Sequence, residues 1–204
     1  AVGDNTGQGA AYVFAGSDGS WGDIQKFAAS DGATDDAFAT SVAISGTTSL
    51  VGAYNASVEG NSSQGASYFY SSTPTLAKSF MPDTITANDA SVLTITLANT
   101  NDVAATLSAD LVDNLPTPVV VANPANAATT CPSGIVIADA GTGAVTLDAG
   151  AQIPAAGTCT VTVSVTADSE GDYTNTIPVG SLQTDLGNNP EPATADLTVS
   201  AITP

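Results

Sequence analysis

The chain has 204 residues, 43% hydrophobic and 5% aromatic, which is enough for one large or two small domains with an aliphatic core. Twenty acidic residues against two lysines give a net charge of −18, and without a basic patch this excludes a nucleic-acid partner and disfavours anionic membranes. The absence of histidine excludes Ser-His-Asp and Cys-His catalytic sites.

Two parts of the chain differ in composition. Residues 1–71 are rich in glycine and hold most of the aromatic residues, whereas residues 74–204 hold nearly all the prolines and both cysteines. The segment SSTP, residues 71–74, is predicted to be a linker, because Pro74 and the small polar residues interrupt the strand pattern. We therefore expect two parts, both built from β-strands.

The first part contains an internal repeat. GQGAAYVF, residues 7–14, returns as SQGASYFY, residues 63–70. Between the two copies, FATSVAISGTTSLVGAY, residues 38–54, is predicted to form a β-hairpin that turns at Gly46-Thr47-Thr48. A strand–loop–strand unit that recurs at this distance is typical of a propeller blade.

These segments resemble the FG-GAP repeat of integrin-like propellers. The resemblance rests on FATSV, LVGA, QGASYFY and the preceding GDIQKFAASDGATDDAF, and covers about residues 1–70. Ala39 departs from the family, which has glycine there, and Tyr54 stands in place of its final proline. The resemblance implies the end of one blade in residues 1–27 and most of a second in residues 28–70.

Two blades cannot close a propeller, which takes about four to eight. Three arrangements would satisfy the open strand edges. In the first, the chain is a fragment of a longer protein that holds the other blades. In the second, the partial sheet packs on the second part of the chain. In the third, neighbouring copies add strands at edges near residues 1–14 and 63–71.

An acidic loop in the first part is a candidate metal site. Asp31, Asp35 and Asp36, in SDGATDDAF, supply carboxylates that Ca²⁺ accepts as ligands. The regular D-x-D-x-D-G pattern of calcium-binding FG-GAP loops is absent, and a solvated turn at Asp31-Gly32 explains the same residues. Trp21, with acidic neighbours, is compatible with sugar binding, although a large aromatic more often packs in a blade core.

The second part reads as a series of short strands. In SVLTITLAN, residues 91–99, Leu93, Ile95 and Leu97 face one way. Further strands are predicted at residues 105–112, in a hairpin over residues 134–148 about Gly141-Thr142-Gly143, and at residues 159–167, 172–179 and 195–201. About seven alternating strands predict an immunoglobulin-like (Ig-like) β-sandwich over residues 74–204, so the fold class is all-β.

This part resembles a conserved Ig-like repeat of bacterial surface and secreted proteins. The resemblance rests on PTLAKSFMPDTITANDASVLTITLANTN, IPAAGTCTVTVSVTADSEGDYTNTIP and ATADLTVS, and covers residues 74–201. It implies a structural role in stalks, adhesins and cell-envelope arrays, and no activity.

The two cysteines, Cys131 and Cys159, are predicted to form a disulfide. Cys159 alternates with valines, so it points into the core. A disulfide that closes this loop of about 28 residues contributes roughly 3–4 kcal/mol and indicates an oxidising compartment. A metal or redox pair is the alternative, but no histidine or further cysteine is present to complete a metal site.

Lys78 is expected to be an exposed strand residue that can pair with a carboxylate. A lysine in a surface Ig-like domain can also form an isopeptide bond with Asn or Asp, but the sequence contains no motif that predicts one.

We expect a structural subunit of an extracellular filament or cell-surface layer, secreted and processed at its start, whose copies complete each other's sheets. The alternative is a fragment of a larger secreted adhesin with a propeller that binds a ligand, with or without calcium. The expected partners of the protein are copies of itself, other surface proteins or glycans. We expect no membrane insertion and no required cofactor. An enzyme is not expected: a glycosidase needs two carboxylates about 5–10 Å apart, and no candidate pair stands out.

Overall fold

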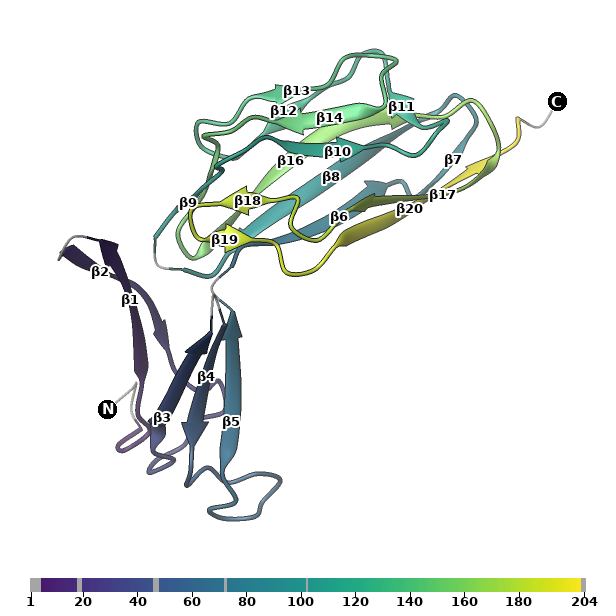
Figure 1. Cartoon of the computed structure of the whole chain (residues 1–204). Helices are drawn as coiled ribbons and strands as arrows, with labels where there is room; N and C mark the ends of the chain where they lie inside the picture. The colour runs from purple at the N-terminus through teal and green to yellow at the C-terminus, as the bar shows by residue number, and fades with distance from the viewer. Residues whose placement is uncertain (1–4, 18–19, 46–47, 72, 102, 203–204) are drawn as a thin grey trace. The chain divides into compact units, whose positions relative to one another are not determined.

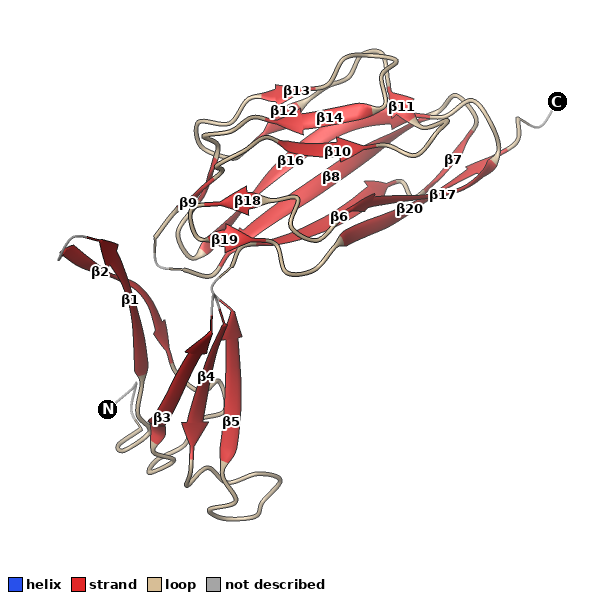
Figure 2. Ribbon diagram, viewed as in Figure 1, coloured by secondary structure: helices blue, strands red, loops and turns tan. Residues whose placement is uncertain are grey.

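The computed structural model describes residues 5–17, 20–45, 48–71, 73–101 and 103–202. Within these ranges the regular secondary structure consists of β-strands, with no helix, as Figures 1 and 2 show. The predicted all-β class is therefore confirmed. A search of the same residues for a helix able to cross a membrane finds none. The chain divides into a first unit, Ala1–Ser72 with Asn101–Val103, and a second unit that comprises the rest.

The first unit contains a hairpin and a three-stranded sheet. The hairpin pairs β1 (Ala11–Ser17) with β2 (Ser20–Phe27), and the sheet has the order β3 (Phe38–Ser45), β4 (Thr48–Ala53), β5 (Ala66–Ser71). All these pairings are antiparallel. The predicted hairpin over residues 38–54 is confirmed, and residues 46–47 of its turn lie outside the described residues.

A small aromatic cluster holds the first unit together. Phe27, at the end of β2, stacks on Tyr70 of β5 with ring centroids 4.2 Å apart. Phe38 meets Tyr68 edge-on, with ring centroids 5.4 Å apart, and Val51 of β4 is buried in the same cluster. Such ring pairs add attraction to the burial of apolar area, so this cluster joins the hairpin to the sheet.

The second unit is a β-sandwich with two layers of strands (Figure 1). The first layer has the order β11 (Val120–Val121), β16 (Gly157–Thr166), β8 (Ala90–Asn99), β6 (Thr75–Met81), and β12 (Ala128–Thr129) also pairs with β16. The second layer contains two sheets: β10 (Leu111–Asn114), β14 (Ala144–Leu147), β13 (Val136–Ile137), and β17 (Gly171–Ile177), β20 (Ala193–Ser200), β7 (Thr84–Thr86). Short pairs complete it: β9 (Ala105–Thr106) with β15 (Gln152–Ile153), and β18 (Gln183–Thr184) with β19 (Gly187–Asn188).

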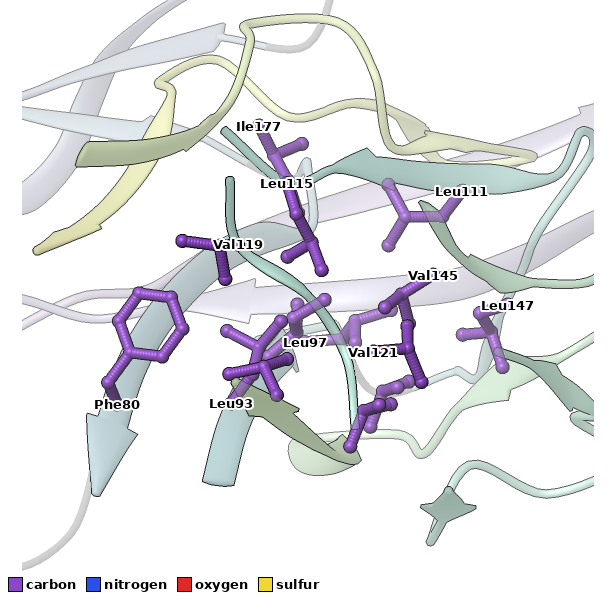
Figure 3. Close-up of a cluster of buried hydrophobic side chains, with 14 of the residues drawn as sticks. Phe80, Leu93, Leu97, Leu111, Leu115, Val119, Val121, Val145, Leu147 and Ile177 are labelled. Carbon is purple, nitrogen blue, oxygen red and sulfur yellow. The ribbon is translucent and has the colours of Figure 1, made fainter. Parts of the chain in front are cut away.

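The core of the sandwich follows the alternation of its two longest strands. β8 and β16 pair antiparallel along their whole length. The residues predicted to face inward are buried in both strands, which confirms the pattern: Leu93, Ile95, Leu97, Cys159, Val161, Val163 and Val165. Leu111, Val145 and Ile177 of the opposite layer pack against them (Figure 3).

The strand predicted over residues 105–112 is wrong. Residues 105–106 form β9, and the chain bends before β10 begins at Leu111. Leu107 and Leu111 are both buried, as their spacing suggests. The polar residues between them do not continue the strand but form hydrogen bonds to two other segments of the chain. Ser108 N donates to Gln183 O, and Asp110 Oδ1 accepts from Ala149 N. Their hydrogen bonds outweigh the alternation seen in the sequence.

Two isoleucines test the position of the core. Ile153 of β15 is 0% exposed, whereas Ile137 of β13 is 53% exposed. We expect Ile153→Ala to lower the free energy of unfolding by about 3 kcal/mol, because it removes buried methylenes and leaves a cavity. The matched control Ile137→Ala should cost less than about 1 kcal/mol. Urea denaturation of the whole chain measures both, and equal losses would contradict this core.

Candidate functional site

The acidic loop is tied down by its own carboxylates. Asp31 Oδ1 accepts a hydrogen bond of 2.8 Å from the hydroxyl of Tyr68. Asp36 is buried, and its Oδ2 accepts a bond of 2.6 Å from the backbone N–H of Ala33. Asp35 is exposed and has a positive φ of 66°, with its N–H donating to Thr6 O. Asp36 therefore bonds within the loop, and Asp31 ties the loop to β5.

These carboxylates do not converge on one point. Over the part of the chain that the structure describes, no group of three or more His, Cys, Asp and Glu side chains could hold a metal ion. Calcium at Asp31, Asp35 and Asp36 stays a prediction, without support from a formed site. The side chain of Trp21 lies outside the described residues, so its role in a blade core or in sugar binding stays a prediction as well.

The environment of Tyr68 alters its acidity. Burial first, then the hydrogen bond to Asp31 and the charges of Asp31 and Asp36, together raise the pKa of Tyr68 to about 12. Burial also raises the pKa of Tyr70, with a contribution from Asp31. Both tyrosines therefore hold their protons more tightly in the folded chain. Because Asp31 contributes to both shifts, the acidic loop affects the acidity of two side chains of β5.

The two copies of the internal repeat are both strands, β1 and β5, and they use opposite faces. In β5, Tyr68 and Tyr70 pack on the aromatic cluster while Phe69 is 76% exposed. In β1, the residues at the repeat positions of those tyrosines, Tyr12 and Phe14, are 53% and 54% exposed. Ala11 and Val13 pack on the core of the first unit instead.

The outer face of the three-stranded sheet is open. Ala43, Leu50 and Phe69 lie side by side in the register of β3, β4 and β5, and all three are exposed. Next to them the side chains are small, and a groove lined by Ser41, Gly52 and Ser67 crosses the sheet. Within the described residues, β5 pairs with β4 on one edge and β1 with β2 on one edge, and the other edge of each pairs with no strand.

The disulfide forms as predicted. Cys131 and Cys159 are bonded, and both are buried in the core of the sandwich. The bond joins the segment directly after β12 to β16, one of the two inner strands of the first layer. The cysteines are therefore structural in this unit, and no free cysteine remains.

The expected exposure of Lys78 is wrong. Its side chain is 0% exposed and pairs with Asp113, whose side chain is also 0% exposed. Burial lowers the pKa of Lys78, while the charge of Asp113 opposes that change. Sequence reasoning missed Asp113 and its neighbour Asn175 altogether. The available signal was spacing: Lys78 alternates with Leu76 and Phe80 on β6, which places it on the inward face.

Fold and sites together define a two-unit β protein, with an open partial blade unit and a disulfide-bonded sandwich. Residues 74–199 match the model of a family described as a domain of unknown function (DUF7933), and the chain belongs to this family. Residues 21–70 match the FG-GAP repeat, which confirms the resemblance over those residues and leaves residues 1–20 outside the match. A comparison with curated proteins gives no match.

Two solved structures are similar to the chain at low identity. The seventh ScaB type I cohesin from Pseudobacteroides cellulosolvens is 14% identical with a TM-score of 0.39, over 64% of this chain and 95% of that chain. The yeast delta-COP-I mu-homology domain is 12% identical with a TM-score of 0.29, over 69% of this chain and 63% of that chain.

The titration of Tyr68 tests the loop. Because its folded pKa lies above the ordinary value of 10.0, the neutral phenol contributes stability that is present below pH 10 and is lost as the pH rises through about 12. We expect Asp31→Asn to shift the pKa of Tyr68 down toward 10, followed by the ultraviolet absorbance of tyrosinate. Tyr68→Phe identifies the late-titrating component, and an unchanged titration in Asp31→Asn would contradict the contact.

Proposed function

We propose that the chain is a structural module of an extracellular filament or cell-surface layer, and that its first unit joins neighbouring copies. The main support is the pair of open, repeat-related faces on β1 and β5. The disulfide and the FG-GAP match favour an extracellular setting. The chain is proposed to act by assembly and not as an enzyme.

The contact inside the first unit is a template for the contact between copies. Val13 of β1 packs on the aromatic cluster that contains Tyr68 and Tyr70 of β5. Phe69 occupies the repeat position of Val13, and it is left exposed on β5. Phe14 occupies the repeat position of Tyr70, and it is left exposed on β1. Each of the two repeat-related strands therefore buries one face within the chain and leaves exposed the face that the other strand buries.

A second copy of the chain supplies both missing counterparts. The face of one copy that carries Tyr12 and Phe14 would pack on the outer face of the next, which carries Leu50 and Phe69. Such a contact joins two different surfaces, so it continues from copy to copy and gives a filament unless the rotation between copies closes a ring. The free edge of β5 allows a strand of the neighbour to extend the sheet in the same contact.

Charge sets the conditions for this assembly. The net charge of −18 makes copies repel each other. The proposed contact adds little to this repulsion, because the face around Leu50 and Phe69 is uncharged and the face with Tyr12 and Phe14 carries the cation Lys26 over the Tyr12 ring. We therefore expect association to strengthen with added salt, which screens the repulsion between exposed charges.

The FG-GAP match also favours a second candidate, a larger adhesin whose further repeats cover the same two faces. In that case the neighbouring blades belong to the same polypeptide, and the ligand, with or without calcium, binds at loops of the completed propeller. The assembly state of the isolated wild-type chain at high concentration and high salt separates these two candidates.

Single substitutions on the two faces test the assembly. We expect Phe69→Asp and Phe14→Asp each to abolish chain-like assemblies of the wild type, because each places a charge in an apolar contact. Val179→Asp is the matched control: Val179 is 60% exposed in the second unit, so assembly should persist. Sedimentation velocity and electron microscopy measure the products.

A mixture gives the sharper result. Phe69→Asp keeps the Phe14 face and Phe14→Asp keeps the Phe69 face, so an equal mixture should form dimers and nothing longer. A wild type that stays monomeric at high concentration and high salt would contradict assembly between copies and favour the adhesin. Dimers of either variant alone would contradict the head-to-tail contact.

A further inference from the structure

Three polar side chains meet inside the β-sandwich. Lys78 Nζ lies 2.8 Å from Oδ1 and 2.7 Å from Oδ2 of Asp113. Asn175 Nδ2 donates a hydrogen bond of 3.1 Å to the same Oδ2. Asn175 is 1% exposed, and its Oδ1 accepts no hydrogen bond from any described residue. The amide of Asn175 is therefore held beside the amine of Lys78 with its carbonyl oxygen unsatisfied.

The strands bring these side chains from distant parts of the sequence. Lys78 lies on β6 of the first layer, whereas Asp113 lies on β10 and Asn175 on β17, in the two sheets of the second layer. The cross-strand partners of Lys78 and Asp113 are both buried and apolar, Ile95 and Val145. The three polar groups are thus enclosed by the core and shielded from water.

An ordinary buried ion pair explains this arrangement poorly. Removing two charges from water costs more than their attraction returns unless every remaining polar atom is satisfied, and here a carbonyl oxygen is not. The same site is well suited to an amine acting as a nucleophile. Burial lowers the pKa of Lys78, which favours the neutral amine, and Asp113 is in contact with both nitrogens.

We propose that Lys78 and Asn175 become joined by an intramolecular isopeptide bond, with Asp113 as the proton acceptor. Both nitrogens contact one oxygen of Asp113, so they lie no farther apart than those two contacts together allow. Asn175 Cγ is one bond from that Nδ2, so the carbon to be attacked belongs to the group that shares Asp113 Oδ2 with the amine.

The reaction balances without any further reactant. The ammonium of Lys78 gives one proton to the carboxylate of Asp113, and the neutral Nζ attacks Cγ of Asn175. The Nζ–Cγ bond forms, the Cγ–Nδ2 bond breaks, and a second proton passes from Nζ to Nδ2, which leaves as ammonia. Asp113 ends protonated beside the new amide, and nothing is oxidised or reduced.

The bond would tie the start of the sandwich to its end. β6 is the first strand of the second unit, and β17 lies near its end, so the cross-link encloses most of the domain. Closing a long loop removes freedom from the unfolded chain, and it also prevents the two layers from separating under tension. This inference does not depend on the proposed assembly of the first unit.

The mass of the intact, reduced wild-type chain tests the proposal directly. We expect a mass lower than that of the sequence by about 17 Da, the mass of ammonia. Lys78→Gln, Asn175→Ala and Asp113→Ala should each show the full mass expected for its own sequence. Lys26→Gln is the matched control and should keep the loss, because Lys26 is exposed on β2.

Trypsin provides a second readout that needs no variant to fold. The chain contains two lysines and no arginine, so the denatured wild type should be cut after Lys26 but not after the acylated Lys78. The denatured Asn175→Ala variant should be cut after both. A branched peptide that contains Lys78 and Asn175 then identifies the bond.

Three results would overturn the proposal. A folded wild type with the full mass of its sequence would make the cluster an ion pair only. A loss of about 18 Da, the mass of water, would place the bond between Lys78 and a carboxyl group instead of Asn175. A loss of ammonia that persists in Lys78→Gln would place the reaction elsewhere in the chain.

Discussion

The continuous pairing of β8 with β16 is the constraint on which the second unit depends. Because the two strands pair along their whole length, the alternate side chains of both strands lie on one face and form a continuous buried apolar surface. β6 then pairs on the other edge of β8 in a register that sets Lys78 opposite Ile95. Residues opposite each other point to the same face, so this register directs a lysine into the core.

A charge in that position dictates much of the opposite layer. Lys78 requires a counter-ion, and Asp113 on β10 supplies it at 2.7 Å. Asp113 alternates with Leu111 on the inward face of its strand, and Asn175 alternates with Ile177 on β17. Each polar residue thus replaces one apolar position of its strand. The sandwich gives up three positions of apolar core to this cluster, which is why a purely stabilising role accounts for it poorly.

The first unit is organised differently, because its core is small and its sheets are incomplete. Phe27, Phe38, Tyr68 and Tyr70 hold the hairpin and the sheet together, while Phe14 and Phe69 are left on the outside. Large exposed apolar residues on repeat-related strands are the observation that supports the proposed assembly. The two units therefore combine a self-contained sandwich with a unit whose faces remain available.

The amino-acid sequence by itself determined the β class, the inward faces of β8 and β16, the hairpin over residues 38–54 and the pairing of Cys131 with Cys159. All of these follow from local alternation, from turn residues or from having two cysteines. Tertiary structure alone decided that residues 105–112 break and that Lys78 meets Asp113 and Asn175. Those outcomes depend on which strands from distant parts of the chain lie opposite each other, and no local pattern encodes that register.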